Sequence, residues 1–163
     1  MSKYAGIIKD DVTNGKGIGL VLFVQGCLHH CKGCHNPETW DLNGGLEFTQ
    51  EVLNEIVNYF KKNLQVTRLT LSGGDPIFNS EVALIVAKTI KEIRPDVKIW
   101  TYTGYLFEQI KEYHLLKYTD VLIDGPFILE KRDVSLPFRG SSNQRIIDVK
   151  KSLKKGEIIL YSL

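Results

Sequence analysis

The sequence predicts an α/β domain built on a parallel β-sheet. Short runs rich in apolar and β-branched residues alternate with longer segments whose apolar residues recur at helical spacing, which is typical of a sheet with crossover helices. Glycine-containing turns follow several of the expected strands. Because 43% of the 163 residues are hydrophobic, there is enough apolar material for one core, and we expect residues 1–163 to form a single domain.

The first half of the chain predicts two strands and a helix. A strand or hairpin arm is expected at 4–9, and a buried strand at 20–25, where an apolar run ends at Gly26. A helix is expected at 49–62, because Thr49 is a suitable N-cap and apolar residues follow it at helical spacing: Val52, Leu53, Ile56, Val57 and Phe60.

The second half continues the alternation. Strands are expected at 68–71, 97–102, 120–123, 146–149 and 157–161, and helices at 80–93, 105–117 and 148–155. Arg94-Pro95 ends the helix at 80–93, since the residue before proline disfavours helical geometry.

Polar and glycine-rich segments follow four of the expected strands. They are the cysteine-containing loop after residue 26, Ser72–Pro76, Thr103-Gly104 and Asp124–Pro126. The carboxyl ends of parallel strands share one edge of a sheet, where active sites collect. We therefore expect these segments to converge in space.

The chain contains three cysteines, Cys27, Cys31 and Cys34, within eight residues. An odd number of thiols cannot form a complete disulfide framework. Three thiolates on one loop suit a 4Fe–4S cluster with an open fourth iron. The alternative is a zinc ion held by the three cysteines and one nearby histidine: His29, His30 or His35. Clustered free thiolates require a reducing compartment, so a cytoplasmic location is expected.

The other motifs are open to several interpretations. Ser72–Pro76 is an ordinary turn before a helix, or a turn whose glycines let a ligand approach the backbone. Arg139–Arg145 is a plain loop, or a set of donors for an anionic ligand or a partner protein. Asp124, at a strand end, is a cap, a turn residue or a ligand contact.

Composition excludes several functional classes. A net charge of +2 gives no support for nucleic-acid binding. The first eleven residues lack the hydrophobic region of a signal peptide, and the longest apolar runs are far shorter than a membrane span, so no membrane association is expected.

The cysteine spacing, followed by a Gly-Gly turn at a strand end, resembles the radical S-adenosylmethionine superfamily. Over about residues 4–161 the chain resembles one family within it, the activating proteins of anaerobic (class III) ribonucleotide reductase. The segments that carry this likeness are Val21–Cys27, Cys34–Trp40, Trp100–Tyr105, Asp124–Phe127 and Arg139–Arg145. Two residues depart from the superfamily pattern: Gly33 stands where an aromatic residue is frequent, and Asp75 where glutamate is frequent.

The resemblance implies a single radical SAM domain that is an incomplete, open parallel (β/α) barrel, since a complete barrel takes about 250 residues. It implies that Cys27, Cys31 and Cys34 bind a 4Fe–4S cluster whose open iron chelates S-adenosylmethionine. Reductive cleavage would yield a 5′-deoxyadenosyl radical, which forms a glycyl radical on the reductase large subunit. No catalytic side chain is implied, and the implied cofactor-binding residues are Gly33, Cys34, His35, Ser72, Gly73, Gly74 and Asp124.

The implied partners are the large subunit of the anaerobic reductase and a one-electron donor, either flavodoxin-like or of the thioredoxin type. A branched side chain at Gly74 is expected to weaken cofactor binding and leave the cluster intact. Two alternatives stay open: an activase of another glycyl radical enzyme, such as pyruvate formate-lyase, and a non-catalytic zinc-binding module. The Arg139–Arg145 segment favours the ribonucleotide reductase.

Overall fold

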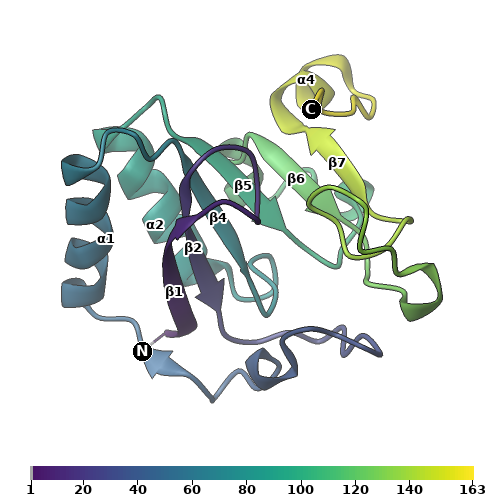
Figure 1. Cartoon of the computed structure of the whole chain (residues 1–163), viewed down its shortest axis with the longest axis horizontal. Coiled ribbons are helices and arrows are strands. Elements are labelled where there is room, and N and C mark those ends of the chain that lie inside the picture. The colour runs from purple at the N-terminus through teal and green to yellow at the C-terminus, as the bar shows by residue number, and fades with distance from the viewer. Residues whose placement is uncertain (1) are drawn as a thin grey trace.

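The computed structural model describes residues 2–163, whose strands form one seven-stranded sheet in the order β3-β1-β2-β4-β5-β6-β7 (Figure 1). The strands are β1 (Lys3–Asp11), β2 (Gly19–Val24), β3 (Leu46–Glu47), β4 (Arg68–Gly73), β5 (Lys98–Tyr102), β6 (Val121–Asp124) and β7 (Arg145–Asp148). The α-helices are α1 (Gln50–Lys62), α2 (Ser80–Ile93), α3 (Phe107–Ile110) and α4 (Val149–Lys155), and the 3₁₀ helices are η1 (Pro37–Thr39), η2 (His114–Lys117) and η3 (Leu129–Lys131).

The centre of the sheet is parallel and its margins are antiparallel. Strands β2, β4, β5 and β6 pair in parallel, whereas β1 pairs antiparallel with β2 and β3, and β7 antiparallel with β6. The ends of the order, β3 and β7, do not pair with each other, so the sheet is open. The predicted incomplete, open α/β barrel is confirmed, but local patterns did not predict that its margins run antiparallel.

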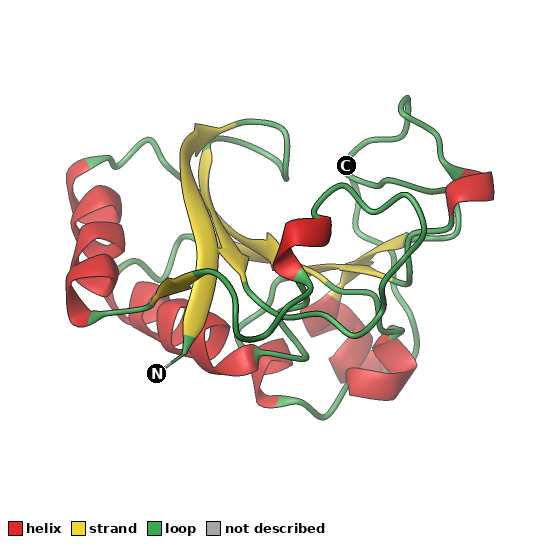
Figure 2. Cartoon of the chain, turned by 90° about the horizontal axis from the view of Figure 1, so that it is seen from below, coloured by secondary structure: helices red, strands yellow, loops and turns green. Residues whose placement is uncertain are grey.

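Helices α1 and α2 cover one face of this sheet. Figures 1 and 2 show α1 and α2 side by side against it, and their apolar residues share a core with those of the strands. Helix α1 begins where predicted, since the Thr49 hydroxyl accepts a hydrogen bond from the Val52 amide. Glu51 in its first turn and two lysines in its last turn complement the helix dipole.

The other face of the sheet is concave and partly open. Side chains alternate along each strand, so Leu22 and Val24 of β2 join the helix-side core while Phe23 lies on the opposite face. Phe23 is paired in register with Ser72 of β4, which lies on the same face. Part of this face is filled by the buried Trp100, which packs edge-on against Phe138. The remainder, toward the carboxyl ends of the strands, is hollow.

The prediction of one helix at 105–117 is wrong, because the chain forms the short helix α3 and the separate 3₁₀ helix η2 there. Phe107, Ile110, Leu115 and Leu116 are all buried. In one continuous helix, at about 100° per residue, Leu116 would lie opposite Phe107 and could not share its core. Breaking the helix near Tyr113 lets both leucines reach the interior.

The strand predicted at 157–161 is also wrong, since the structure has only an isolated bridge between Leu160 and Ile147. Helix α4 occupies most of the connection after β7. It begins at Asp148, whose carboxylate accepts from the Lys151 amide, and ends at Gly156, which has a left-handed φ of 72°. The short return of the chain leaves room for one bridging pair. The other predicted elements are present with small shifts at their ends.

Within residues 2–163, no helix combines the length and the apolar composition that crossing a membrane requires.

Candidate metal and cofactor site

A cavity of about 550 Å³ lies on the concave face, at the carboxyl ends of the parallel strands. The segments predicted to converge do so here: the cysteine loop after β2, the glycine turn after β4, and the turns after β5 and β6. Residues of the loop before β7 and of the β1–β2 connection complete the lining. A cavity of this size suits a cofactor-sized ligand.

Most residues predicted for the site line this cavity, and two do not. The lining includes Cys27, Cys31, Cys34, His35, Ser72, Gly73 and Gly74. Gly33 lies on the same loop with a left-handed φ of 79°, and a side chain there would meet Leu129 and Phe127. Asp124 is fully buried beneath the cavity and is not part of its lining.

Backbone hydrogen bonds hold the cysteine loop against the segment around η1. The Gly26 amide donates to the Thr39 carbonyl at 2.6 Å and the Cys27 amide to the Trp40 carbonyl at 3.1 Å, and within the loop the Cys34 amide donates to the Cys31 carbonyl at 3.0 Å. The His30 ring stacks on the Trp40 ring, with centroids 4.4 Å apart. These contacts fix a loop that contains little regular structure, and they present its thiols to the cavity.

The Cys27 thiol lies deepest, because Cys27 is buried and the other two cysteines are half-buried. Burial, together with the nearby Asp75 carboxylate, raises the pKa of Cys27 to about 11. The metal-free protein therefore holds Cys27 as the neutral thiol at pH 7. Metal binding would release this proton, since a thiolate is the metal ligand.

Asp75 is a hub that joins three loops of the site, which the sequence did not indicate. Its carboxylate is 1% exposed and lies 2.8 Å from Nε2 of His29 in the cysteine loop. It also accepts hydrogen bonds from the Thr103 hydroxyl, from the Gly104 amide at 2.9 Å and from the Ile77 amide at 2.9 Å. Three segments that are remote in sequence are thus tied to one buried group.

The glycine turn packs against the cysteine loop with no space between them. A Cβ on Gly74 would lie 2.3 Å from the Gly26 carbonyl oxygen, and one on Gly104 would lie 2.6 Å from the His29 ring. Gly73 has a left-handed φ of 102°. Hydrogen bonds from the Gly74 amide to the Val24 carbonyl and from the Asp75 amide to the Gly26 carbonyl, both at 2.8 Å, fix this contact.

Asp124 and Arg145 form a support behind the site. The Asp124 carboxylate accepts from the Phe107 amide at 2.8 Å and pairs with the Arg145 guanidinium. The hydrogen bonds that the Arg145 guanidinium donates to Asp124 and, to a smaller extent, to Glu108 raise the pKa of Arg145 further above its ordinary value. Because these partners occupy both residues, the geometry favours the cap interpretation of Asp124 over direct ligand contact.

Arg139 is placed differently from Arg145. It lines the cavity, and it is the sole lysine or arginine among the lining residues. Its Nη1 donates to the Gln144 carbonyl at 3.2 Å, while its buried Nε has no hydrogen-bond partner within the described residues. Buried donors in proteins are usually paired. Arg139 is therefore poised to meet an anionic group in the cavity.

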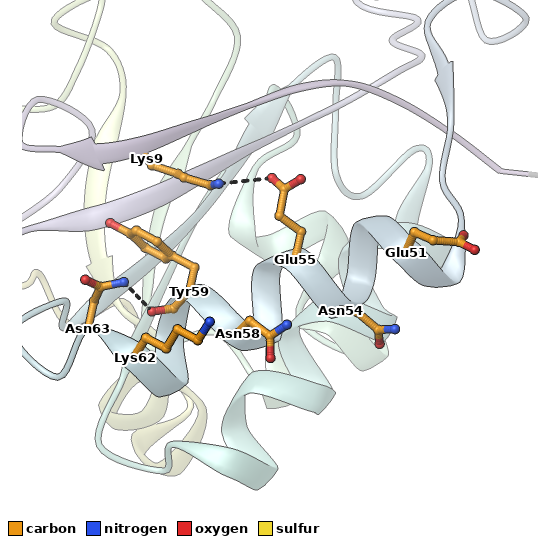
Figure 3. Close-up of a pocket in the computed structure, with 8 residues that line it drawn as sticks. All are labelled: Lys9, Glu51, Asn54, Glu55, Asn58, Tyr59, Lys62 and Asn63. Carbon is orange, nitrogen blue, oxygen red and sulfur yellow. Dashed lines mark hydrogen bonds and ion pairs between the residues drawn. The ribbon is translucent and has the colours of Figure 1, made fainter.

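A second hollow, of about 570 Å³, lies between β1 and the outer side of α1 (Figure 3). Lys9 and Glu55, both about half exposed, pair across it at 3.2 Å, and the Asn63 amide donates to the Tyr59 carbonyl. Its lining holds no thiol and no histidine. The three thiols, together with His29 and His35, line the cavity on the concave face.

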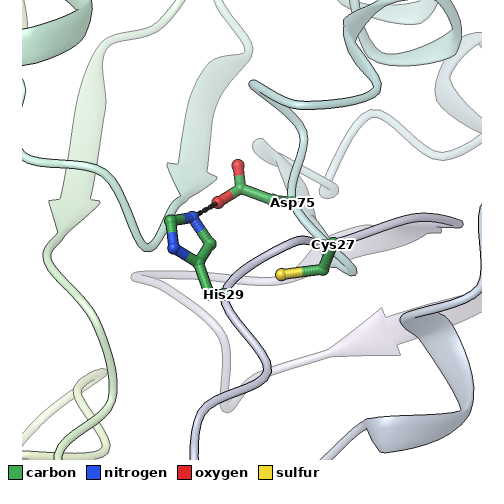
Figure 4. A group of neighbouring side chains, drawn as sticks. All are labelled: Cys27, His29 and Asp75. Carbon is green, nitrogen blue, oxygen red and sulfur yellow. Dashed lines mark hydrogen bonds and ion pairs between the residues drawn. The ribbon is translucent and has the colours of Figure 1, made fainter.

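The cysteine cavity fits a cluster better than a single ion. Within the described chain, the group whose donor atoms all lie within 4.8 Å of one another is Cys27, His29 and Asp75 (Figure 4). Zinc needs four convergent ligands, but His29 is already bonded to Asp75, and Cys31 and Cys34 are not in this group. A 4Fe–4S cluster binds each thiolate at a different iron, so thiols spread around one cavity suit it.

Comparison with known proteins gives a consistent match. The family described as a 4Fe–4S single cluster domain matches residues 13–147. The chain is 44% identical over 141 residues to the anaerobic ribonucleoside-triphosphate reductase-activating protein of Vibrio cholerae, which covers 83% of this chain and 91% of that protein. The protein of the same name from Enterobacteria phage T4 is 42% identical over 149 residues (88% and 92% covered), and that from Escherichia coli K12 is 39% identical over 144 residues (82% and 90% covered).

Proposed function

The chain belongs to the family of anaerobic ribonucleoside-triphosphate reductase-activating proteins, and from this membership we propose that it forms a glycyl radical on the large subunit of that reductase. The family inferred from the cysteine spacing and the later segments is confirmed. The chain is thus a radical-type activase with a 4Fe–4S domain. The names of the relatives favour the ribonucleotide reductase over another glycyl radical enzyme.

Cys27, Cys31 and Cys34 would hold the 4Fe–4S cluster. The observation that carries this assignment is the donor set, three thiols on one loop around one cavity, in a chain that has no other cysteine. Together with S-adenosylmethionine, the cluster supplies one-electron chemistry that begins with reductive cleavage of the sulfonium and ends with hydrogen abstraction from a glycine of the reductase.

The glycine turn and the cysteine loop would hold S-adenosylmethionine. Ser72, Gly73 and Gly74 expose backbone to the cavity, and Gly73 adopts a conformation that leaves no room for a side chain. The backbone near Gly33, Cys34 and His35 would meet the adenine. Asp124 would act from behind, by fixing the start of α3 and the position of Arg145.

The protein's own part in the reaction is to position these groups and exclude water. The side chains of Phe23, Tyr102, Phe127 and Phe138 give the cavity apolar walls. The Asp75 hub holds the cysteine loop and the glycine turn in one arrangement, so the two binding segments keep a fixed spacing. The open sheet provides a side from which a partner's glycine-bearing segment could enter.

We place the protein in the cytoplasm, because clustered free thiols require a reducing compartment. Its electron donor would be a flavodoxin-like or thioredoxin-type protein.

The decisive experiment combines metal analysis with radical detection. Protein reconstituted anaerobically with iron and sulfide is expected to bind about four irons per chain. With a reductant, S-adenosylmethionine and the reductase large subunit, it is expected to give a glycyl radical signal by electron paramagnetic resonance. A colourless protein with one zinc per chain would support the zinc-module alternative instead. Radical formation on pyruvate formate-lyase in place of the reductase would support the other activase.

We predict that Arg139→Ala weakens S-adenosylmethionine binding, because Arg139 is the cavity's guanidinium and the ligand carries a carboxylate. Loss of a charged hydrogen bond corresponds to roughly a ten- to hundredfold rise in Kd. Equilibrium dialysis with the cluster-loaded protein measures it. The control is Arg132→Ala, an exposed arginine of the same loop that does not line the cavity.

The same two variants test the alternative in which the Arg139–Arg145 segment contacts a partner protein. If Arg139→Ala binds S-adenosylmethionine normally but forms little glycyl radical, the side chain contacts the reductase and not the cofactor. If both properties are normal, neither role is correct.

A further inference from the structure

The connection between β1 and β2, residues 12–18, folds back over the concave face instead of extending beyond the sheet. In Figure 1 this dark purple loop lies in front of β4 and β5, and Figure 2 shows it curling over the same side of the sheet. Thr13 and Asn14 line the cavity together with the cysteines. A Cβ on Gly15 would meet the Arg68 side chain at 2.4 Å and the Trp100 ring at 3.0 Å, so the loop rests directly on the floor of the concave face.

Arg68 holds this loop from below. It is the first residue of β4, its side chain is 1% exposed, and its guanidinium donates to four backbone carbonyls at the end of β1 and in the loop: Asp11 (2.7 Å), Asn14 (3.0 Å), Lys16 (3.2 Å) and Gly17 (3.3 Å).

Two partners complete the anchor. The Asp11 carboxylate pairs with Arg68 at 2.9 Å and balances its charge. The Thr70 hydroxyl, on the same face of β4, donates to the Asn14 carbonyl at 2.8 Å. In the described part of the chain, no backbone hydrogen bond joins two residues of the loop. The Asp11 carboxylate also accepts hydrogen bonds from the Thr13 hydroxyl and the Asn14 amide, both at 2.9 Å, so Asp11, Arg68 and Thr70 together hold the loop's conformation.

Arg68 and the cysteines lie at opposite ends of the parallel strands, and on the Arg68 side it is Thr13 and Asn14 of the loop that line the cavity. Strand β4 runs from Arg68 to Gly73, and at about 3.3 Å per residue this separates the anchor from the glycine turn by roughly 16 Å. The cofactor segments close the carboxyl end of the cavity, and the loop closes the amino end. A reaction inside the cavity is shielded from water only while this loop stays in place.

We propose that residues 12–18 form the far wall of the reaction cavity and that Arg68 is the positioning residue that holds this wall, a role that rests on the proposed glycyl radical function. The loop keeps the space beside the cofactor dry and shaped for the glycine-bearing segment. Release of the loop therefore uncouples consumption of S-adenosylmethionine from radical formation, while the cluster site at the other end is untouched.

The test compares Arg68→Met with Arg94→Met, both in the full-length, cluster-loaded protein. Arg94 is a matched control because it too is a buried arginine that donates to backbone carbonyls, those of Phe60, Leu64 and Val66, but it lies on the helix side of the sheet. Gly15→Ala is a second variant that displaces the loop from its own side and leaves Arg68 intact.

Three quantities are measured: iron per chain, the rate of trypsin cleavage after the exposed Lys16, and glycyl radicals formed per S-adenosylmethionine cleaved. Arg68→Met and Gly15→Ala are expected to retain wild-type iron. Loss of several hydrogen bonds should speed cleavage after Lys16 at least about tenfold, and the radical ratio should fall several-fold. Arg94→Met should leave the last two quantities unchanged.

The proposal is overturned if the folded Arg68→Met protein keeps the wild-type cleavage rate after Lys16, or if its radical ratio is normal although the loop is released. An equal fall of the ratio in Arg94→Met also overturns it, because the effect would then be general destabilisation. If the wild-type protein forms no glycyl radical at all, the proposed function fails, and the trypsin comparison still decides whether Arg68 holds the loop.

Discussion

Alanine at Cys27, Cys31 or Cys34 is expected to abolish cleavage of S-adenosylmethionine. Each thiol would bind a different iron of the cluster, and no other cysteine in the chain can replace one that is lost. Two remaining thiolates on a loop with little regular structure do not retain a cluster. Each variant should therefore contain far less than four irons per chain, measured after anaerobic desalting, and should release no 5′-deoxyadenosine.

The control for the cysteine variants is Leu28→Ala in the same loop. Leu28 is 67% exposed, so its truncation removes little buried surface. This variant should bind iron like the wild type. If one of the cysteine variants keeps a full cluster and full cleavage activity, that cysteine is not a ligand, and a histidine of the loop must be considered in its place.

The cysteine loop and the glycine turn were predictable because each signal is local. Their residues are close in sequence and follow strands, and parallel strands place such segments at one edge of a sheet. The structure confirms that edge and the shared cavity. The antiparallel pairing of β7 was not predictable, since the residue pattern of a short strand does not encode its direction.

The contacts that hold the site together were missed for a different reason. Asp75 and His29 are 46 residues apart, and Arg68 reaches carbonyls more than 50 residues away. Neither pair produces a spacing that a sequence pattern could reveal. The sequence pattern identifies Asp75 only as a shorter residue in place of glutamate. In the fold its short side chain places the carboxylate within hydrogen-bond distance of two other loop segments, the cysteine loop at His29 and the Thr103-Gly104 turn.

The packing of the glycine turn also changes what a substitution there should do. From the sequence, a side chain at Gly74 is expected to obstruct the cofactor and leave the cluster intact. In the structure the Cβ position of Gly74 lies 2.3 Å from the Gly26 carbonyl oxygen and 2.9 Å from the Gly26 amide nitrogen. The clash is with the backbone next to Cys27, so the cluster loop itself must move.

We therefore predict that Gly74→Ala impairs both cluster binding and S-adenosylmethionine binding. Backbone-to-backbone contacts cannot be relieved by a change of rotamer, so overpacking here should cost about 3 kcal/mol or more of unfolding free energy. For a chain of this size that corresponds to a fall in Tm of roughly 6–12 °C. Thermal unfolding of the metal-free protein, iron per chain and equilibrium dialysis of S-adenosylmethionine measure the three effects.

The matched control for Gly74→Ala is Gly6→Ala in β1, where a Cβ would meet nothing within 4 Å. It makes the same chemical change in β1, which contributes no residue to the cavity lining, and its Tm and iron content should stay near those of the wild type. If Gly74→Ala keeps four irons and a wild-type Tm but binds S-adenosylmethionine weakly, the turn contacts the cofactor without supporting the cysteine loop. If all three properties are normal, the close packing of Gly74 on Gly26 is not required for either site.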